Sequence, residues 1–140
     1  VPAQLASKEP SLREPVFVSV GYNPQYDLAS YSFSWTAEVK FETYPSKNLC
    51  IETAYNGKPS GLVATKAYKW LHMRPLSRSE LLVFEFDVNV LRAFVERFST
   101  RYGGDGGKSS FKIIPMDEAE KITSDKFTLK VNWAQFQPNW

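Results

Sequence analysis

Apolar and polar residues alternate strictly along two parts of this chain. In the segment 31–42, YSFSWTAEVKFE, every odd position is aromatic or aliphatic and every even position is polar. The segment 126–133, KFTLKVNW, repeats the pattern, with Phe127 and Leu129 among its apolar positions. A period of two over such lengths predicts β-strands that turn one face to a core and the other to water.

Five further segments have the composition of strands. They are 15–22 (PVFVSVGY), 49–55 (LCIETAY), 62–73 (LVATKAYKWLHM), 79–86 (SELLVFEF) and 111–115 (FKIIP). The segment 79–86 is apolar on both faces, which predicts a central strand that is covered on two sides. The alternation within 62–73 is poor, so we expect an edge position or a β-bulge there.

The hydrophobic period changes after residue 86. Helical spacing relates Val88, Leu91, Phe94, Val95 and Phe98. Asp87 is a suitable N-cap and the glycines after Tyr102 are a stop signal, so we predict one helix near 88–100. The acidic segment 116–121, MDEAEK, is expected to form a single helical turn or a loop.

About seven strands and one helix predict a mainly β protein. The expected architecture is an antiparallel β-sandwich or partly open barrel, with the helix covering an end or a face. Residues 1–15 are polar and contain three prolines, which predicts an extended N-terminal arm. Residues 16–140 are then expected to form a single β-rich domain.

The composition agrees with a folded domain and narrows the classes of partner. Hydrophobic residues make up 43% of the 140 residues and aromatic residues 15%, and aromatic side chains favour strands. A net charge of +2 argues against nucleic acid as a partner, and no apolar run is long enough for a membrane span. The first residues, VPAQLASKEP, resemble the remnant of a secretory cleavage region, which favours an extracellular or periplasmic location slightly over the cytoplasm.

The stretch 101–111, RYGGDGGKSSF, has the composition of a phosphate-binding loop but not its pattern. Tyr102 stands where the P-loop motif requires its first glycine. The motif must also follow a strand and open a helix, whereas the predicted order here is helix first and strand second. We therefore expect a flexible connector from which Tyr102, Asp105 and Lys108 contact a partner.

Residues suited to catalysis or metal binding are sparse. The chain has one histidine, His72, and one cysteine, Cys50. They could form a base and nucleophile pair, but the position of Cys50 between aliphatic residues favours a packed, unreactive thiol. Neither a four-ligand zinc set nor calcium-loop spacing is present, so no metal or other cofactor is predicted. Carboxylates such as Glu38 and Glu42, on the polar face of the long strand, leave a small hydrolase as a third hypothesis.

The sequence thus favours a non-catalytic module that binds another protein. It would be a subunit of a hetero- or homo-oligomeric complex, or an inhibitor or immunity-type protein, acting through a sheet edge, its terminal arms and aromatic or arginine anchors. The alternative is a carbohydrate-binding β-sandwich in which exposed Tyr and Trp residues stack on a glycan. The residues expected to contact the partner are Tyr22, Tyr26, Trp70, Arg74, Arg78, Tyr102, Asp105, Lys108 and Trp140.

Overall fold

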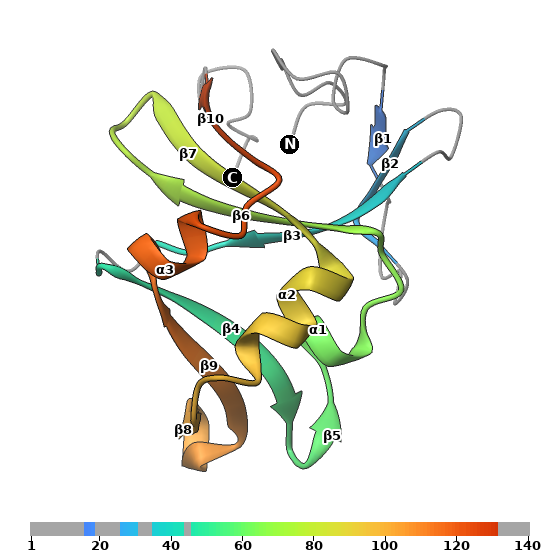
Figure 1. Cartoon of the computed structure of the whole chain (residues 1–140), viewed down its shortest axis with the longest axis vertical. Coiled ribbons are helices and arrows are strands. Elements are labelled where there is room, and N and C mark those ends of the chain that lie inside the picture. The colour runs from blue at the N-terminus through green and yellow to red at the C-terminus, as the bar shows by residue number, and fades with distance from the viewer. Residues whose placement is uncertain (1–15, 19–25, 31–34, 44–45, 132–140) are drawn as a thin grey trace, which may run out of the picture.

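The fold is mainly β, as the alternating pattern predicts. The computed structural model describes residues 16–18, 26–30, 35–43 and 46–131, and within them two sheets pack around a core (Figure 1). The larger sheet curves into a half-barrel, which confirms the expected β-sandwich or partly open barrel. None of the helices in these ranges has the length and apolar character needed to cross a bilayer.

The larger sheet has six strands and the smaller sheet has four. In spatial order the larger contains β1 (Val16–Val18), β2 (Leu28–Ser30), β3 (Thr36–Phe41), β6 (Lys69–Pro75), β7 (Glu80–Asp87) and β10 (Asp125–Lys130). The smaller contains β5 (Lys58–Pro59), β4 (Asn48–Tyr55), β9 (Ser109–Pro115) and β8 (Thr100–Gly103). The helices are α1 (Gly61–Ala64), α2 (Val88–Val95) and α3 (Met116–Glu120), and a 3-10 turn covers Asp105–Gly107.

Two excursions of the chain from the larger sheet build the smaller one. The first leaves after β3, forms β4, β5 and α1, and returns as β6, which pairs with β3 in parallel. The second leaves after β7, forms α2, β8, β9 and α3, and returns as β10. Because parallel neighbours require a long crossover, the first excursion explains why one pair departs from the antiparallel arrangement that we expected.

The segment 62–73 differs most from its prediction. Its first residues belong to α1 and its last residues, from Lys69 on, to β6, which is a central strand of the larger sheet and not the expected edge strand. Trp70 and His72 face the smaller sheet, while Leu71 and Met73 face the opposite side, and all four are buried. The alternation of apolar and polar residues is poor because both faces of this strand are covered. A strand that is buried on both faces need not alternate, so its sequence does not indicate which face is turned to the core.

The predicted helix is confirmed, but it is shorter than the spacing suggested. Asp87 caps α2 by accepting a hydrogen bond from the amide of Val90 at 3.0 Å, as expected. The helix ends at Val95, and Thr100–Gly103 form strand β8. The glycine-rich loop therefore joins two strands of a hairpin and does not follow a helix, because Thr and Tyr favour a paired strand when β9 offers one.

Two apolar clusters cover opposite faces of the larger sheet. One includes Leu71, Val83 and Phe127 on the concave face of the half-barrel. The other fills the space between the two sheets, where α2 packs against both, and it includes Trp70 and Phe84. Phe127 and Leu129 point inward from β10, and its lysines point outward, as the alternation predicts.

Gly61 holds α1 close to β4. Its φ is +50°, and a Cβ added there would collide with the carbonyl oxygen of Glu52. We expect Gly61→Ala to lower the free energy of unfolding by about 3 kcal/mol or more, because it adds a backbone collision to an unfavourable φ. The matched control is Gly57→Ala, whose φ of +78° is also positive but where no atom lies within 4 Å of the added Cβ.

The control is expected to cost only about 1 kcal/mol, the price of the left-handed conformation alone. Urea unfolding followed by tryptophan fluorescence measures both variants. Equal losses would show that α1 can move away from β4 without consequence.

Candidate functional site

The free end of the smaller sheet brings together two hairpins from the two excursions. The β4–β5 hairpin turns at Asn56 and Gly57, and the β8–β9 hairpin turns through Asp105–Gly107. The amide of Asn56 donates a hydrogen bond to the carbonyl of Lys108 at 2.8 Å, so the two tips lie side by side. Figure 1 places these tips at the lower end of the molecule, away from the larger sheet.

Strand β8 forms an open edge beside these tips. The strand order puts it outside β9, and Thr100, Arg101 and Tyr102 are all exposed. Tyr102 is 72% exposed, the highest fraction among the large hydrophobic side chains that the structure describes. In register, Arg101 lies opposite Phe111 and Tyr102 opposite Ser110, so the arginine and the tyrosine project from opposite faces of the sheet.

Two other strand edges carry protection that β8 lacks. Edge strand β5 is only two residues long and ends in Pro59, which has no amide proton to offer a neighbour. Edge strand β10 carries Lys126 and Lys130, whose charges disfavour pairing with another chain. Strand β8 has no proline, and its central side chains are an arginine and a tyrosine, which are common anchors at protein interfaces.

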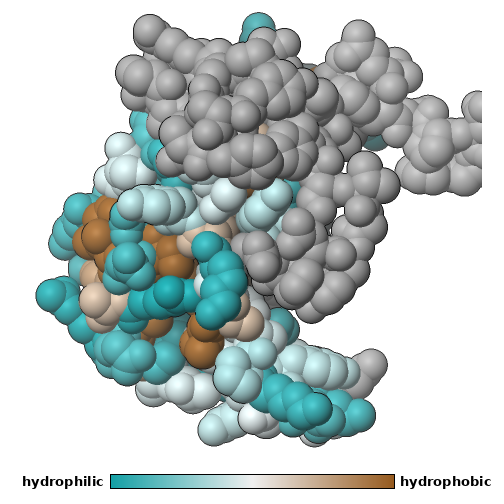
Figure 2. All heavy atoms as spheres, turned by 90° about the vertical axis from the view of Figure 1, so that its right-hand side faces the viewer, coloured by the Kyte–Doolittle hydropathy of each residue, from teal (hydrophilic) through white to brown (hydrophobic). Residues whose placement is uncertain are grey.

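Basic side chains predominate around this edge. Lys58, Arg101 and Lys108 are exposed on the hairpins, and none of them forms an ion pair with any residue that the structure describes. The carboxylates in the sequence of these elements are Asp105 in the turn between β8 and β9, Glu52 on β4 and Glu96 after α2. Figure 2 shows a hydrophilic surface at the lower end of the molecule, where the tips lie.

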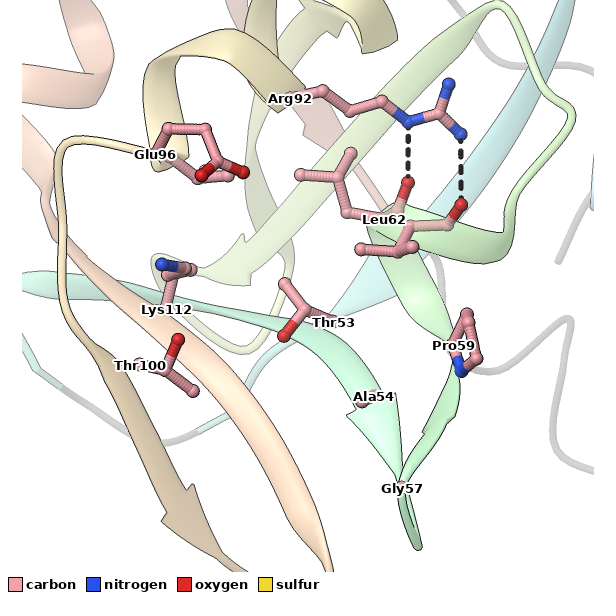
Figure 3. A pocket seen from close by; sticks show the side chains of 11 residues that line it. Thr53, Ala54, Gly57, Pro59, Leu62, Arg92, Glu96, Thr100 and Lys112 are labelled. Atoms are coloured by element: carbon pink, nitrogen blue, oxygen red, sulfur yellow. Dashed lines mark hydrogen bonds between the residues drawn. The ribbon is translucent and has the colours of Figure 1, made fainter.

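A groove of about 620 Å³ opens between the inner face of the smaller sheet and the helices α1 and α2 (Figure 3). Its walls combine apolar and polar side chains, namely those of Thr53, Ala54, Pro59, Leu62, Val63, Arg92, Val95, Glu96, Thr100 and Lys112, together with Gly57. Thr100 belongs to β8, so the groove reaches the open edge.

The cations of this groove are already bound to the backbone. Arg92 donates from Nε to the carbonyl of Leu62 at 2.9 Å and from Nη2 to that of Thr65 at 2.6 Å, which ties α2 to the end of α1. Lys112 donates to the carbonyl of Phe98 at 2.6 Å, where the chain passes from α2 towards β8. These bonds satisfy carbonyls that the short helices leave open, so both residues hold the groove in shape.

The structure gathers only some of the residues that we expected to contact a partner. Tyr102 and Lys108 lie together at the exposed end, and Asp105 begins the turn between them, although its side chain is outside the described part. Arg78 is exposed in the turn between β6 and β7, at the larger sheet, and Tyr26 is half-buried. Tyr22 and Trp140 lie outside the described residues.

Trp70 and Arg74 have internal contacts instead. Both are buried, at 2% and 7% exposure, on the face of β6 that looks towards the smaller sheet. Arg74 donates from Nη1 to the carbonyl of Asn48 at 2.8 Å and contacts Met116 Sδ at 2.9 Å, so it links β6 to β4 and α3. Trp70 and Arg74 are therefore not part of an outer surface that a partner could contact.

His72 belongs to the same buried row and is held in one tautomer. Trp70 Nε1 donates to His72 Nδ1 at 3.2 Å, so Nδ1 carries no proton and Nε2 donates to Glu42 Oε1 at 2.6 Å. Burial lowers the pKa of His72 and outweighs the opposing contribution of Glu42, which keeps the ring neutral. For Glu42, burial is outweighed by hydrogen bonds from His72 and the Cys50 amide, so its pKa is lowered.

Glu42 is bonded to both His72 and the backbone of Cys50, so His72 Nε2 is engaged by Glu42 and not by the Cys50 thiol. Its Oε1 accepts from both His72 and the amide of Cys50, the latter at 3.1 Å. Burial, together with the charge of Glu42, raises the pKa of the Cys50 thiol, which disfavours the nucleophilic thiolate. Cys50 and Glu42 also line a cavity of about 300 Å³ with Ser46, Asn48 and Ile113. The arrangement is a hydrogen-bonded seam between the sheets, without an activated nucleophile.

Glu38 on β3 forms a carboxyl pair with Asp27, just before β2, which the sequence did not indicate. Glu38 accepts a hydrogen bond from Thr65 Oγ1 at 2.7 Å, and Asp27 accepts one from the amide of Val39 at 2.7 Å. Burial raises the pKa of Glu38 to about 7, with a further contribution from the charge of Asp27 and the hydrogen bond between the two carboxyl groups. The sequence does not indicate this pair, because only the pairing of β2 with β3 brings Asp27 next to Glu38.

No protein-family model, curated protein or solved structure matches this chain. In the part of the chain that the structure describes, no three His, Cys, Asp or Glu side chains are grouped as ligands for a metal ion. The geometry of the described residues is therefore the basis for a functional proposal.

The carboxyl pair makes stability depend on pH. Because the native pKa of Glu38 is about 7 and the ordinary value is 4.5, the folded state binds the proton more tightly, and stability is lost as the pH rises from 4.5 to 7. Glu38→Gln imitates the protonated form and should be more stable than the native protein at pH 8 by about 1–2 kcal/mol, a figure reduced for partial exposure to solvent.

At pH 4 the difference should nearly vanish, since Glu38 is then largely protonated in both the folded and the unfolded protein. Urea unfolding at the two pH values measures it. The control Glu96→Gln alters an exposed carboxylate, and should change stability by less than about 0.5 kcal/mol at either pH. A constant difference between Glu38→Gln and the native protein would contradict the proton linkage.

Proposed function

We propose that this protein is a binding module that engages another protein through the open edge of its smaller sheet. The observation that carries the proposal is strand β8, an edge strand with three consecutive exposed residues and with Tyr102 exposed to 72%. An open edge offers unpaired backbone donors and acceptors to an extended segment of a partner, and the side chains beside it provide selectivity.

The neighbourhood of β8 supports this choice of surface. Tyr102 projects on the groove side of the sheet and Arg101 on the other, so a segment lying along β8 would meet one anchor on each face. Tyrosine and arginine are the residue types that contribute most energy to protein interfaces. The groove behind Thr100 adds a hollow of about 620 Å³ that could receive a partner side chain next to the edge.

The alternatives receive less support from the described residues. Trp35 and Trp70 are buried, which leaves Tyr55 and Tyr102 as the large aromatic side chains exposed on the smaller sheet for stacking on a sugar. The carboxyl pair of Asp27 and Glu38 is engaged with the backbone and with Thr65, which suits a structural role better than hydrolysis.

Site-directed cross-linking tests the proposal. A photoreactive phenylalanine placed at Tyr102 should cross-link a partner in extracts of the native source, and the same group at the exposed Thr128 on β10 should not. The cross-linked protein is identified by mass and purified for binding measurements. Tyr102→Ala should then weaken binding about tenfold or more, and Thr128→Ala less than about twofold.

Equal cross-linking at both positions, or unchanged affinity of Tyr102→Ala for the purified partner, would place the interface elsewhere. Quenching of the exposed tyrosines by glycans, without any protein cross-link at position 102, would favour the carbohydrate-binding alternative.

A further inference from the structure

The geometry of β8 points to the chemistry of the partner segment, an inference that rests on the proposed function. We infer that it is an extended strand with acidic residues at every second position and apolar residues between them. Three features of β8 indicate this chemistry. Its side chains point alternately to the two faces of the sheet, the two faces carry different side chains, and Arg101 has no carboxylate partner among the described residues.

The two faces of the sheet next to β8 present different side chains. The groove face carries Thr100 and Tyr102, and the groove beside them is lined by Arg92 and Lys112, which are bonded to backbone carbonyls, and by the exposed Glu96. The opposite face carries Arg101, which stands opposite Phe111 in the register with β9. A strand paired to β8 must alternate its side chains in the same way, so one set of partner residues meets Tyr102 and the other meets Arg101.

The two sets of partner residues would therefore meet different surroundings, and different residue types are expected in each set. On the face of Arg101, the carboxylate of Glu52 belongs to β4, two strands away, and is engaged by Ser60 Oγ at 2.8 Å. Arg101 therefore lacks a carboxylate partner among the described residues and favours an acidic residue across the edge. On the groove face, Arg92 and Lys112 are already bonded to backbone carbonyls, and the exposed ring of Tyr102 favours an apolar contact.

The same charges disfavour a second copy of this chain at the edge. Pairing two β8 strands would bring two Arg101 side chains close together, and β8 itself contains no carboxylate to offset them. Like charges across neighbouring strands are destabilising. The exposed lysines at the tips, Lys58 and Lys108, would instead attract an acidic segment and speed its association at low salt.

Peptide titration followed by amide NMR tests this inference on the full chain. The probe is an acetylated, amidated peptide VEVEVEV, and the matched control is VKVKVKV, which has the same apolar positions and the opposite charge. The Glu peptide should shift the amide signals of 100–103, with an affinity at least about tenfold above that of the Lys peptide. A Glu peptide methylated on alternate backbone nitrogens should bind more weakly, because it cannot pair with the edge.

Charge reversal distinguishes selectivity from general attraction. Arg101→Glu should lose the preference for the Glu peptide and gain affinity for the Lys peptide, while Lys47→Glu, at an exposed residue just before β4, should keep the native preference. The amide spectrum of each variant also checks that its fold is retained. Equal binding of both peptides by the native protein, or unchanged preference in Arg101→Glu, would overturn the acidic-strand inference.

The two proposals fail in different ways. If position 102 cross-links a partner but neither peptide shifts 100–103, the edge binds a protein of other chemistry and this inference is wrong. If neither experiment detects the edge, the proposed function falls with it. Concentration-dependent self-association of the native protein that shifts the amide signals of 100–103 would identify a second copy as the occupant and would also overturn the inference.

Discussion

The pairing of β4 with β9 is the interaction on which the rest of the structure depends. β4 belongs to the crossover between β3 and β6, and β9 to the excursion between β7 and β10, so this pair joins two segments that would otherwise be long loops. It directs Leu49, Ile51 and Ile114 into the core between the sheets. It also leaves β5 and β8 as the outer strands, and so determines which edge is open.

A polar row on β6 connects the two sheets where the apolar core ends. Trp70 belongs to the core, His72 is bonded to Trp70 and Glu42, and Arg74 reaches the carbonyl of Asn48. Each buried polar group in this row has a partner, which offsets the cost of removing it from water. The histidine, a tryptophan and an arginine of β6 are thereby used in the interior of the protein.

Strands, and the face that each turns to the core, were predictable from the sequence wherever the other face of the strand is exposed to water. Thus Phe127 and Leu129 point inward, as expected, and the Asp87 cap begins α2. The pattern failed for β6, whose two faces are both covered, and for Thr100–Gly103, where helical spacing continued into a segment that β9 recruits as a strand. Among the residues expected to contact a partner, Tyr102 and Lys108 are exposed, and this exposure was predictable from the glycine-rich connector beside them.

The sequence by itself determined the mainly β class, the helix after residue 87 and the exposure of the glycine-rich turn, because these follow from local periodicity, capping and glycine content. The tertiary structure alone decided that β3 and β6 are parallel neighbours, that Glu38 shares its surroundings with Asp27, and that β8 is an open edge. Such relations join residues far apart in the chain. They depend on which strands pair, and a local pattern carries no information about the identity of its partner strand.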